Sequence, residues 1–120
     1  MPAKKTEKKT EKKTTAKKTT AKTTSEAKFQ ADVIKWLKSK GCVVVKNQAG
    51  PGVPAGFPDI TFFKTAFYGM LEVKKTKTSS HRPGQDKFIE KFDEWSYAKF
   101  VYPSNWDEVK AELEEMLRGD

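Results

Sequence analysis

The sequence is poor in cysteine and histidine, with one of each in 120 residues. A single cysteine, Cys42, excludes an intrachain disulfide and fits a reducing cytoplasm. Cys42 begins a β-branched run, so we interpret it as a small apolar residue rather than as a reactive thiol. The one histidine, His81, has no serine or cysteine nucleophile matched to it, so a catalytic triad is not indicated.

Long apolar runs are also missing from the sequence. No stretch reaches the roughly 18 residues needed to span a bilayer. The basic start of the chain lacks the apolar core of a signal peptide. We therefore expect a cytoplasmic protein without a membrane partner.

The first 25 residues contain no aromatic and no branched aliphatic side chain. They hold nine lysines and two glutamates, so they carry +7 of the net charge of +8. Such a segment cannot bury enough apolar surface to offset chain entropy, so we predict a disordered basic tail over residues 1–25 and one domain over 26–120. Lysines that meet phosphates release counterions, which predicts salt-dependent binding of nucleic acid; a solubilising arm without a partner is the alternative.

Two apolar runs in the middle of the chain, Ile60–Phe63 and Met70–Val73, flank a short loop that ends in Gly69. This pattern is typical of a β-hairpin. Side chains alternate between the faces of a strand, so Glu72 and Lys74 project from the same face.

The register of this hairpin decides whether Asp59 joins the two charges. If residues whose numbers sum to 133 face each other, Asp59 lies opposite Lys74 and shares a face with Glu72. A shift by one residue puts Asp59 on the other face. In the first register, the reverse face carries Ile60, Phe62, Leu71 and Val73.

Converging carboxylates of Asp59 and Glu72 repel each other, and a hard cation such as Mg²⁺ relieves that repulsion while keeping waters for a substrate phosphate. Lys74 beside them can orient or deprotonate an attacking water. The pattern therefore indicates phosphodiester hydrolysis. Alternating charges on a solvated strand face are the alternative, but these charges lie within apolar runs, where an unpaired charge would cost several kcal/mol to bury.

Pro58-Asp59, thirteen positions before Glu72-Val73-Lys74, resembles the signature of the PD-(D/E)XK nuclease superfamily. The wider pattern is similar to its VRR-NUC branch, which includes small stand-alone phage and bacterial nucleases, and it covers residues 26 to about 117. The resemblance implies that Asp59, Glu72 and the Val73 carbonyl bind Mg²⁺ or Mn²⁺ and that Lys74 assists the water. It also implies a phage-infected or bacterial cytoplasm.

Two further residues match this superfamily more loosely. Glu26 opens a helix, where it caps the helix or reaches the metal site. Gln85 follows the hairpin, where it orients Lys74, contacts a phosphate or is a plain surface residue.

Basic residues near the hairpin are candidates for phosphate contacts. The basic loop, residues 75–82, contains most of them, and a merely solvated loop is the alternative. The glycine–proline loop, residues 47–57, lacks the Lys-Ser/Thr ending of a nucleotide-binding loop. It either lets backbone approach a phosphodiester beside Asp59 or is a plain connector. The residues that we assign to nucleic-acid contacts are Lys46, Lys75, Lys77 and Arg82.

Helical periodicity predicts three helices around the strands. The first follows a capping box of Thr23 and Glu26 and ends at Gly41. The second has Pro83 in its first turn, and the third is capped by Ser104 or Asn105. The inward residues expected in chain order are Phe29, Val33, Trp36 and Leu37, then Phe88, Ile89, Phe92 and Trp95, then Val109, Leu113, Met116 and Leu117.

Two more strands complete the expected sheet: a short buried strand at Val43–Val45 and a last core strand at Lys99–Tyr102. We expect the three tryptophans to anchor the core. The predicted fold is α/β, a mixed sheet flanked by helices in the order α-β-β-β-α-β-α. The resemblance implies a restriction-endonuclease-like core.

These features together predict a metal-dependent endonuclease that hydrolyses DNA. A small domain without a separate reading module favours structure-selective cutting of junctions, forks or flaps. A homodimer or higher homo-oligomer would supply the two sites needed to cut both strands. The alternatives are a catalytically inactive nucleic-acid-binding protein of the same fold and an RNase.

Overall fold

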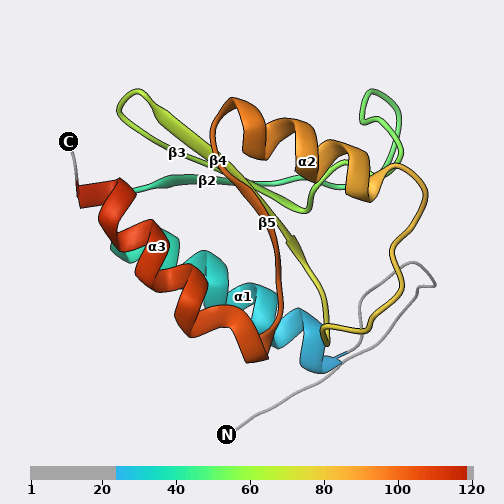
Figure 1. The fold of residues 1–120 in the computed structure, drawn as a ribbon, viewed down its shortest axis with the longest axis horizontal. Helices are drawn as coiled ribbons and strands as arrows, with labels where there is room; N and C mark the ends of the chain where they lie inside the picture. Colours follow the sequence, from blue (N-terminus) through green and yellow to red (C-terminus); the bar gives the residue numbers. More distant parts are fainter. Residues whose placement is uncertain (1–23, 119–120) are drawn as a thin grey trace, which may run out of the picture.

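The computed structural model describes residues 24–118 (Figure 1). Residues 1–23, which include Thr23 and most of the predicted basic tail, lie outside the described residues, and the last two residues of that predicted tail, Thr24 and Ser25, are the first two of the first helix. The elements are α1 (Thr24–Ser39), β2 (Val43–Lys46), β3 (Ile60–Lys64), β4 (Phe67–Val73), α2 (Gln85–Trp95), β5 (Ala98–Val101), the short 3₁₀ helix η2 (Pro103–Asn105) and α3 (Trp106–Arg118). The predicted order of helices and strands is confirmed. None of the described helices is long and apolar enough to cross a membrane.

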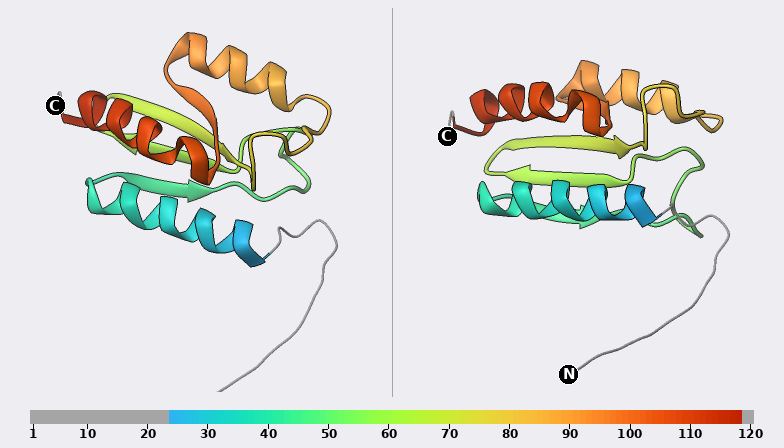
Figure 2. Two further views of the ribbon diagram at one scale, coloured as in Figure 1. Left: turned by 60° about the horizontal axis from the view of Figure 1, so that its bottom comes forward. Right: turned by 90° about the horizontal axis from the view of Figure 1, so that it is seen from below.

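The four strands form one mixed sheet in the order β2-β3-β4-β5. The β2–β3 and β3–β4 pairs are antiparallel, whereas β4 and β5 are parallel. Parallel neighbours need a crossover connection, and α2 supplies it between β4 and β5. Helices α1 and α3 cover one face of the sheet and α2 covers part of the other (Figure 2). The predicted fold class, a mixed sheet between helices, is confirmed.

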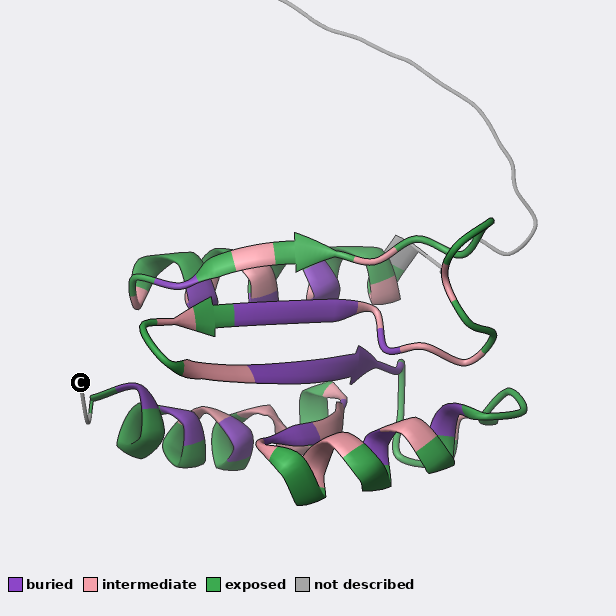
Figure 3. Cartoon of the chain, turned by 90° about the horizontal axis from the view of Figure 1, so that it is seen from above, coloured by how far each residue is buried: buried purple, intermediate pink, exposed green. Residues whose placement is uncertain are grey.

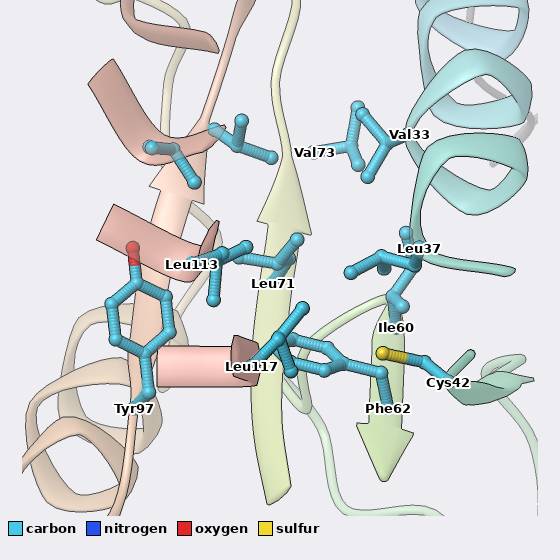
Figure 4. Packing of buried hydrophobic residues seen from close by; sticks show 12 residues of the cluster. Val33, Leu37, Cys42, Ile60, Phe62, Leu71, Val73, Tyr97, Leu113 and Leu117 are labelled. Carbon is cyan, nitrogen blue, oxygen red and sulfur yellow. The ribbon is translucent and has the colours of Figure 1, made fainter. Parts of the chain in front are cut away.

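The main core lies between the sheet and the pair α1 and α3 (Figure 4). Val33 and Leu37 of α1 point toward the β-branched and aromatic residues of the central strands. Cys42 is buried in this core, and that burial raises the pKa of its thiol. The other fully or nearly fully buried residues of the core are Ile60, Phe62, Leu71, Val73, Tyr97, Val101, Val109, Leu113 and Leu117.

The hairpin has the predicted faces but a different register. The numbers of facing residues sum to 131, as for Ile60 and Leu71, so the predicted register, in which they sum to 133, is wrong by two residues. The turn is only Thr65-Ala66, and Gly69 lies within β4 opposite Phe62 rather than in a loop. A Cβ at Gly69 would lie 2.4 Å from the Phe62 ring, so the glycine makes room for that aromatic side chain. A two-residue shift preserves the faces, because the side-chain period is two.

The strand predicted as buried, β2, is an exposed edge strand (Figure 3). Val43 and Val45 are 65% and 44% exposed, because α2 covers β4 and β5 but not β2. Only Val44, on the other face, packs against the main core. A run of three valines predicts a strand but not whether both of its faces are covered.

Two expected core residues are also exposed. Trp95, the last residue of α2, is 61% exposed, with the Lys91 ammonium 5.6 Å from its ring. The other two tryptophans are partly buried against the main core. Met116 is 43% exposed because it lies at the edge of the stripe that Leu113 and Leu117 present to the sheet.

The helix starts differ slightly from the prediction. Gly84, at a φ of 89°, precedes Gln85, so Pro83 lies outside α2. Before α3, the Asn105 side chain accepts a hydrogen bond of 2.9 Å from the Tyr102 amide. This hydrogen bond joins the residue before η2 to the last residue of η2, and α3 begins at the next residue, Trp106.

Candidate active site

Asp59 and Glu72 lie next to each other at one end of the β3–β4 hairpin. The Asp59 amide donates to Glu72 Oε1 at 3.1 Å, and the Val73 amide donates to Asp59 Oδ2 at 3.0 Å. Each carboxylate therefore accepts a backbone hydrogen bond from the segment that carries the other. The observed register, continued by one pair beyond β3, places Asp59 opposite Glu72 rather than opposite Lys74.

Lys74 and Gln85 complete a buried network with Glu72. The Lys74 ammonium donates to Gln85 Oε1 at 2.8 Å, and Gln85 Nε2 donates to Glu72 Oε2 at 2.9 Å. Lys74 Nζ lies 3.8 Å from Glu72 Oε2. Glu72, Lys74 and Gln85 are all nearly or completely buried, so their hydrogen bonds to one another replace most of the contacts that they would make with bulk water. We call Asp59, Glu72, Lys74 and Gln85 the acid–lysine cluster.

Gln85 reaches this cluster because it is the first residue of α2. Its side chain is completely buried, so it contacts Lys74 and Glu72 rather than solvent. Among the roles that the sequence left open, this geometry corresponds to the orientation of Lys74. The side-chain amide of Gln85 has one orientation, with its oxygen toward the Lys74 ammonium and its nitrogen toward the Glu72 carboxylate.

The basic loop folds back over the lysine. The Ser80 carbonyl accepts from Lys74 Nζ at 3.0 Å, and Gln85 Oε1 also accepts from the Arg82 amide at 2.8 Å. Sequence reasoning missed the Ser80 carbonyl, because a backbone acceptor leaves no signal in the choice of side chain.

His81 anchors this loop without belonging to a triad. Its Nδ1 lies 2.6 Å from Asp86 Oδ1, and its ring stacks on Phe100 with centroids 4.1 Å apart. The histidine directly follows Ser80, so these contacts fix the carbonyl that Lys74 uses. The spacing of His81 and Asp86 across the start of α2 was the only sequence signal for this anchor.

Asn47, the residue after β2, supports the Asp59 segment. Its Nδ2 donates to the Pro58 carbonyl at 3.0 Å and to Thr61 Oγ1 at 2.8 Å. Its backbone amide donates to the Asp59 carbonyl at 2.6 Å. Sequence reasoning read Asn47 only as the start of a loop, although asparagine is common where a strand ends in a turn.

The remaining predicted site residues are more scattered. Glu26 is half-buried in the first turn of α1, which begins at the end of the sheet where β4 ends (Figures 1 and 2). Lys75 and Lys77 are exposed in the basic loop, as is Arg82. Lys46 pairs with Ile60, which faces the main core, so Lys46 lies on the opposite face of the sheet from the acid–lysine cluster.

The donors of the cluster fit a small hard cation. Within residues 24–118, no group of three or more histidine, cysteine, aspartate or glutamate side chains gathers. Asp59, Glu72 and the Val73 carbonyl, the ligands that the sequence resemblance implies, could hold such an ion only with water or substrate oxygens as further ligands. Mg²⁺ is usually held in this way, by one or two carboxylates and several waters, and Mn²⁺ accepts the same oxygens.

No protein-family model matches the chain, and neither does any curated protein. Among solved structures, the chain is similar to Hjc, a Holliday junction resolvase from the archaeal hyperthermophile Archaeoglobus fulgidus. The TM-score is 0.46 and the identity 20%, over 63% of this chain and 67% of that chain.

Replacing Gln85 by leucine tests the buried network. The substitution removes a donor to Glu72 and an acceptor for Lys74, and unsatisfied buried groups of this kind cost about 1–3 kcal/mol. We expect the free energy of unfolding in urea, measured without metal, to fall by at least that amount. Lys87→Leu, at an exposed position of the same helix, is the matched control and should change it by less than about 0.5 kcal/mol. Equal stability of the two variants would contradict the network.

Proposed function

We propose that the protein is a metal-dependent endonuclease of the PD-(D/E)XK type that hydrolyses phosphodiester bonds in DNA. The observation that carries this proposal is the buried Lys74 ammonium, held by Gln85 and the Ser80 carbonyl beside two carboxylates. A lysine fixed in this way presents one positive group to a phosphate that a metal ion held by the carboxylate pair would bind.

Each residue of the cluster has a distinct role in the proposal. Asp59, Glu72 and the Val73 carbonyl would hold Mg²⁺ or Mn²⁺, which supplies Lewis acidity and an activated water when bound. Lys74 orients the attacking water and offsets negative charge that develops on the phosphorus-bound oxygens. Gln85 is a positioning residue for Lys74, and Glu26 is an additional candidate ligand at the same end of the sheet.

The proposed partner is DNA, bound mainly through its backbone. Lys75, Lys77 and Arg82 are exposed in the basic loop that covers Lys74, so they lie close to where a phosphate would react. Because phosphate contacts position a strand without reading bases, we propose that the protein recognises the structure of DNA, such as a junction, fork or flap, rather than a sequence. Action on DNA fits a cytoplasmic protein.

Two alternatives remain in the same fold. A catalytically inactive DNA-binding protein would keep the buried network for stability alone, since the network pairs its charges without a metal. An RNase would use the same acid–lysine cluster to hydrolyse RNA instead of DNA. Two measurements separate the DNA endonuclease from these alternatives: whether the protein cleaves nucleic acid in a metal-dependent way, and whether it cleaves DNA faster than RNA.

Substitution of the cluster tests the proposed activity. We expect Asp59→Ala, Glu72→Ala and Lys74→Met each to lower the rate of nicking of supercoiled DNA in Mg²⁺ by about a thousandfold or more, because each removes a metal ligand or the water-orienting group. EDTA should abolish nicking by the unaltered protein. Glu90→Ala, which removes an exposed acid of α2, is the matched control and should nick at the unaltered rate.

The same assay separates the alternatives. DNA binding, measured by fluorescence anisotropy, should persist in Asp59→Ala while nicking is lost. Branched and linear DNA of the same sequence should differ in rate by at least tenfold, with branched DNA cut faster. Binding without any metal-dependent nicking by the unaltered protein would support the inactive alternative, and faster cutting of RNA would support an RNase.

We also propose that the protein forms a homodimer, which would bring two sites to the two strands of a branched substrate. An exposed apolar row on the edge of the sheet supports this: Val43 pairs with Phe63, and Val45 lies beside them on the same face. Exposed rows of this kind often mark protein interfaces.

Phe63→Asp places a charge in this row. We expect the molar mass measured by light scattering at micromolar concentration to fall from that of a dimer to that of a monomer, because a buried unpaired carboxylate opposes association. Glu90→Asp, exposed on α2, should leave the mass unchanged. A monomer for the unaltered protein at this concentration would contradict the proposed dimer.

A further inference from the structure

A cavity of about 380 Å³ adjoins Asp59. The glycine–proline loop forms most of its wall, and Arg82 and Pro83 close it from the start of α2. Of the acid–lysine cluster, only Asp59 lines this space. The cavity and the cluster therefore meet at one carboxylate, and a molecule bound across both would pass directly over Asp59.

The loop that forms this cavity is fixed at its base. The 2.6 Å hydrogen bond from the Asn47 amide to the Asp59 carbonyl brings its two ends together. Two tight turns follow within it, closed by Val53 N to Gly50 O at 3.0 Å and by Phe57 N to the Pro54 carbonyl at 3.2 Å. Compact loops with adjacent ends are often functional sites held by a rigid scaffold.

The loop is also locked against the start of α2. Gly56 has a φ of 85°, and a Cβ there would lie 2.6 Å from the Pro83 carbonyl oxygen. From the other side, a Cβ at Gly84 would lie 3.0 Å from the Ala55 carbonyl oxygen. The two backbones touch with no side chain between them, so this part of the cavity wall is held by direct backbone packing.

The chemistry of the wall selects a class of ligand. Most of the lining is apolar, including Ala49, Val53, Pro54 and Phe57, and Arg82 is its only cationic side chain. An uncharged, flat heterocycle attached to a phosphate matches such a site, because its faces pack on apolar groups while the guanidinium binds the phosphate. The volume lies within the range typical of small-ligand pockets.

We infer that this cavity receives the base of the nucleotide next to the phosphate that is cut, turned out of its stack. The inference rests on the proposed function, because it places the reacting phosphate at Asp59 and Lys74. Removing a base from a duplex costs a few kcal/mol, and less where the base is already unpaired. The cavity would thereby favour cutting where a nucleotide has left the duplex, as at a fork, junction or flap.

Abasic substrates test this inference with the unaltered protein. A branched DNA whose cut position has been mapped is compared with versions that lack the base at each of the two flanking positions in turn. We expect the loss of one flanking base, and not of the other, to lower kcat/KM by about tenfold to a hundredfold, because stacking of a base on protein is worth about 1–3 kcal/mol.

A paired variant shows whether the cavity is responsible. Ala49→Trp adds an indole at the cavity wall, whereas Ala66→Trp adds the same group at the hairpin turn, at the far end of β3 and β4. Ala49→Trp should cut the complete substrate about as slowly as the abasic one and should no longer distinguish them. Ala66→Trp should retain the unaltered preference. Thermal unfolding of both variants checks that they fold.

The outcomes separate this inference from the proposed function. Metal-dependent cutting that is equally fast with and without either flanking base overturns the cavity inference and leaves the nuclease standing. A preference for the base that survives in Ala49→Trp also overturns it. If the unaltered protein cuts no DNA in Mg²⁺, the proposed function fails, and the inference fails with it.

Discussion

The structure depends on the burial of one ammonium group, that of Lys74, between an amide, a carbonyl and a carboxylate. A buried charge is tolerated only when it is paired and hydrogen-bonded, so three successive segments of the chain must fold back to meet around it. The end of β4 supplies Glu72, the first residue of α2 supplies Gln85, and the basic loop supplies the Ser80 carbonyl. This requirement places the start of α2 above the end of the hairpin, and the hairpin brings Asp59 to the same point.

Most of the fold follows from simple periodicity in the sequence. Apolar spacing predicted the three helices and the central strands, and the alternation of side chains in β4 predicted that Glu72 and Lys74 share a face. The shared face survived an error in register, because a slip of two residues returns every side chain to its own side. The slip arose from Gly69, whose turn-like character hid its use as space for the ring of Phe62.

What the sequence could not reveal depended on neighbours distant along the chain. Val43 and Trp95 are apolar yet exposed, and only the position of α2 over β4 and β5 decides this. The supports of the site, such as the Ser80 carbonyl and the Asn47 amides, act through backbone groups or short polar side chains. Such contacts carry no residue pattern that could be read before the strands and loops are placed.

The exchange of hydrogen bonds between Asp59 and the Glu72–Val73 segment has a consequence for how the site could be lost. Each acid accepts a hydrogen bond from a peptide group of the segment that carries the other acid, so rotation of either side chain away from the site breaks that bond. Fraying of this end of the hairpin would release both acids together, while the rest of the sheet stayed paired. Local opening of this end of the hairpin, rather than unfolding of the whole domain, would therefore be enough to interrupt the arrangement of the two acids.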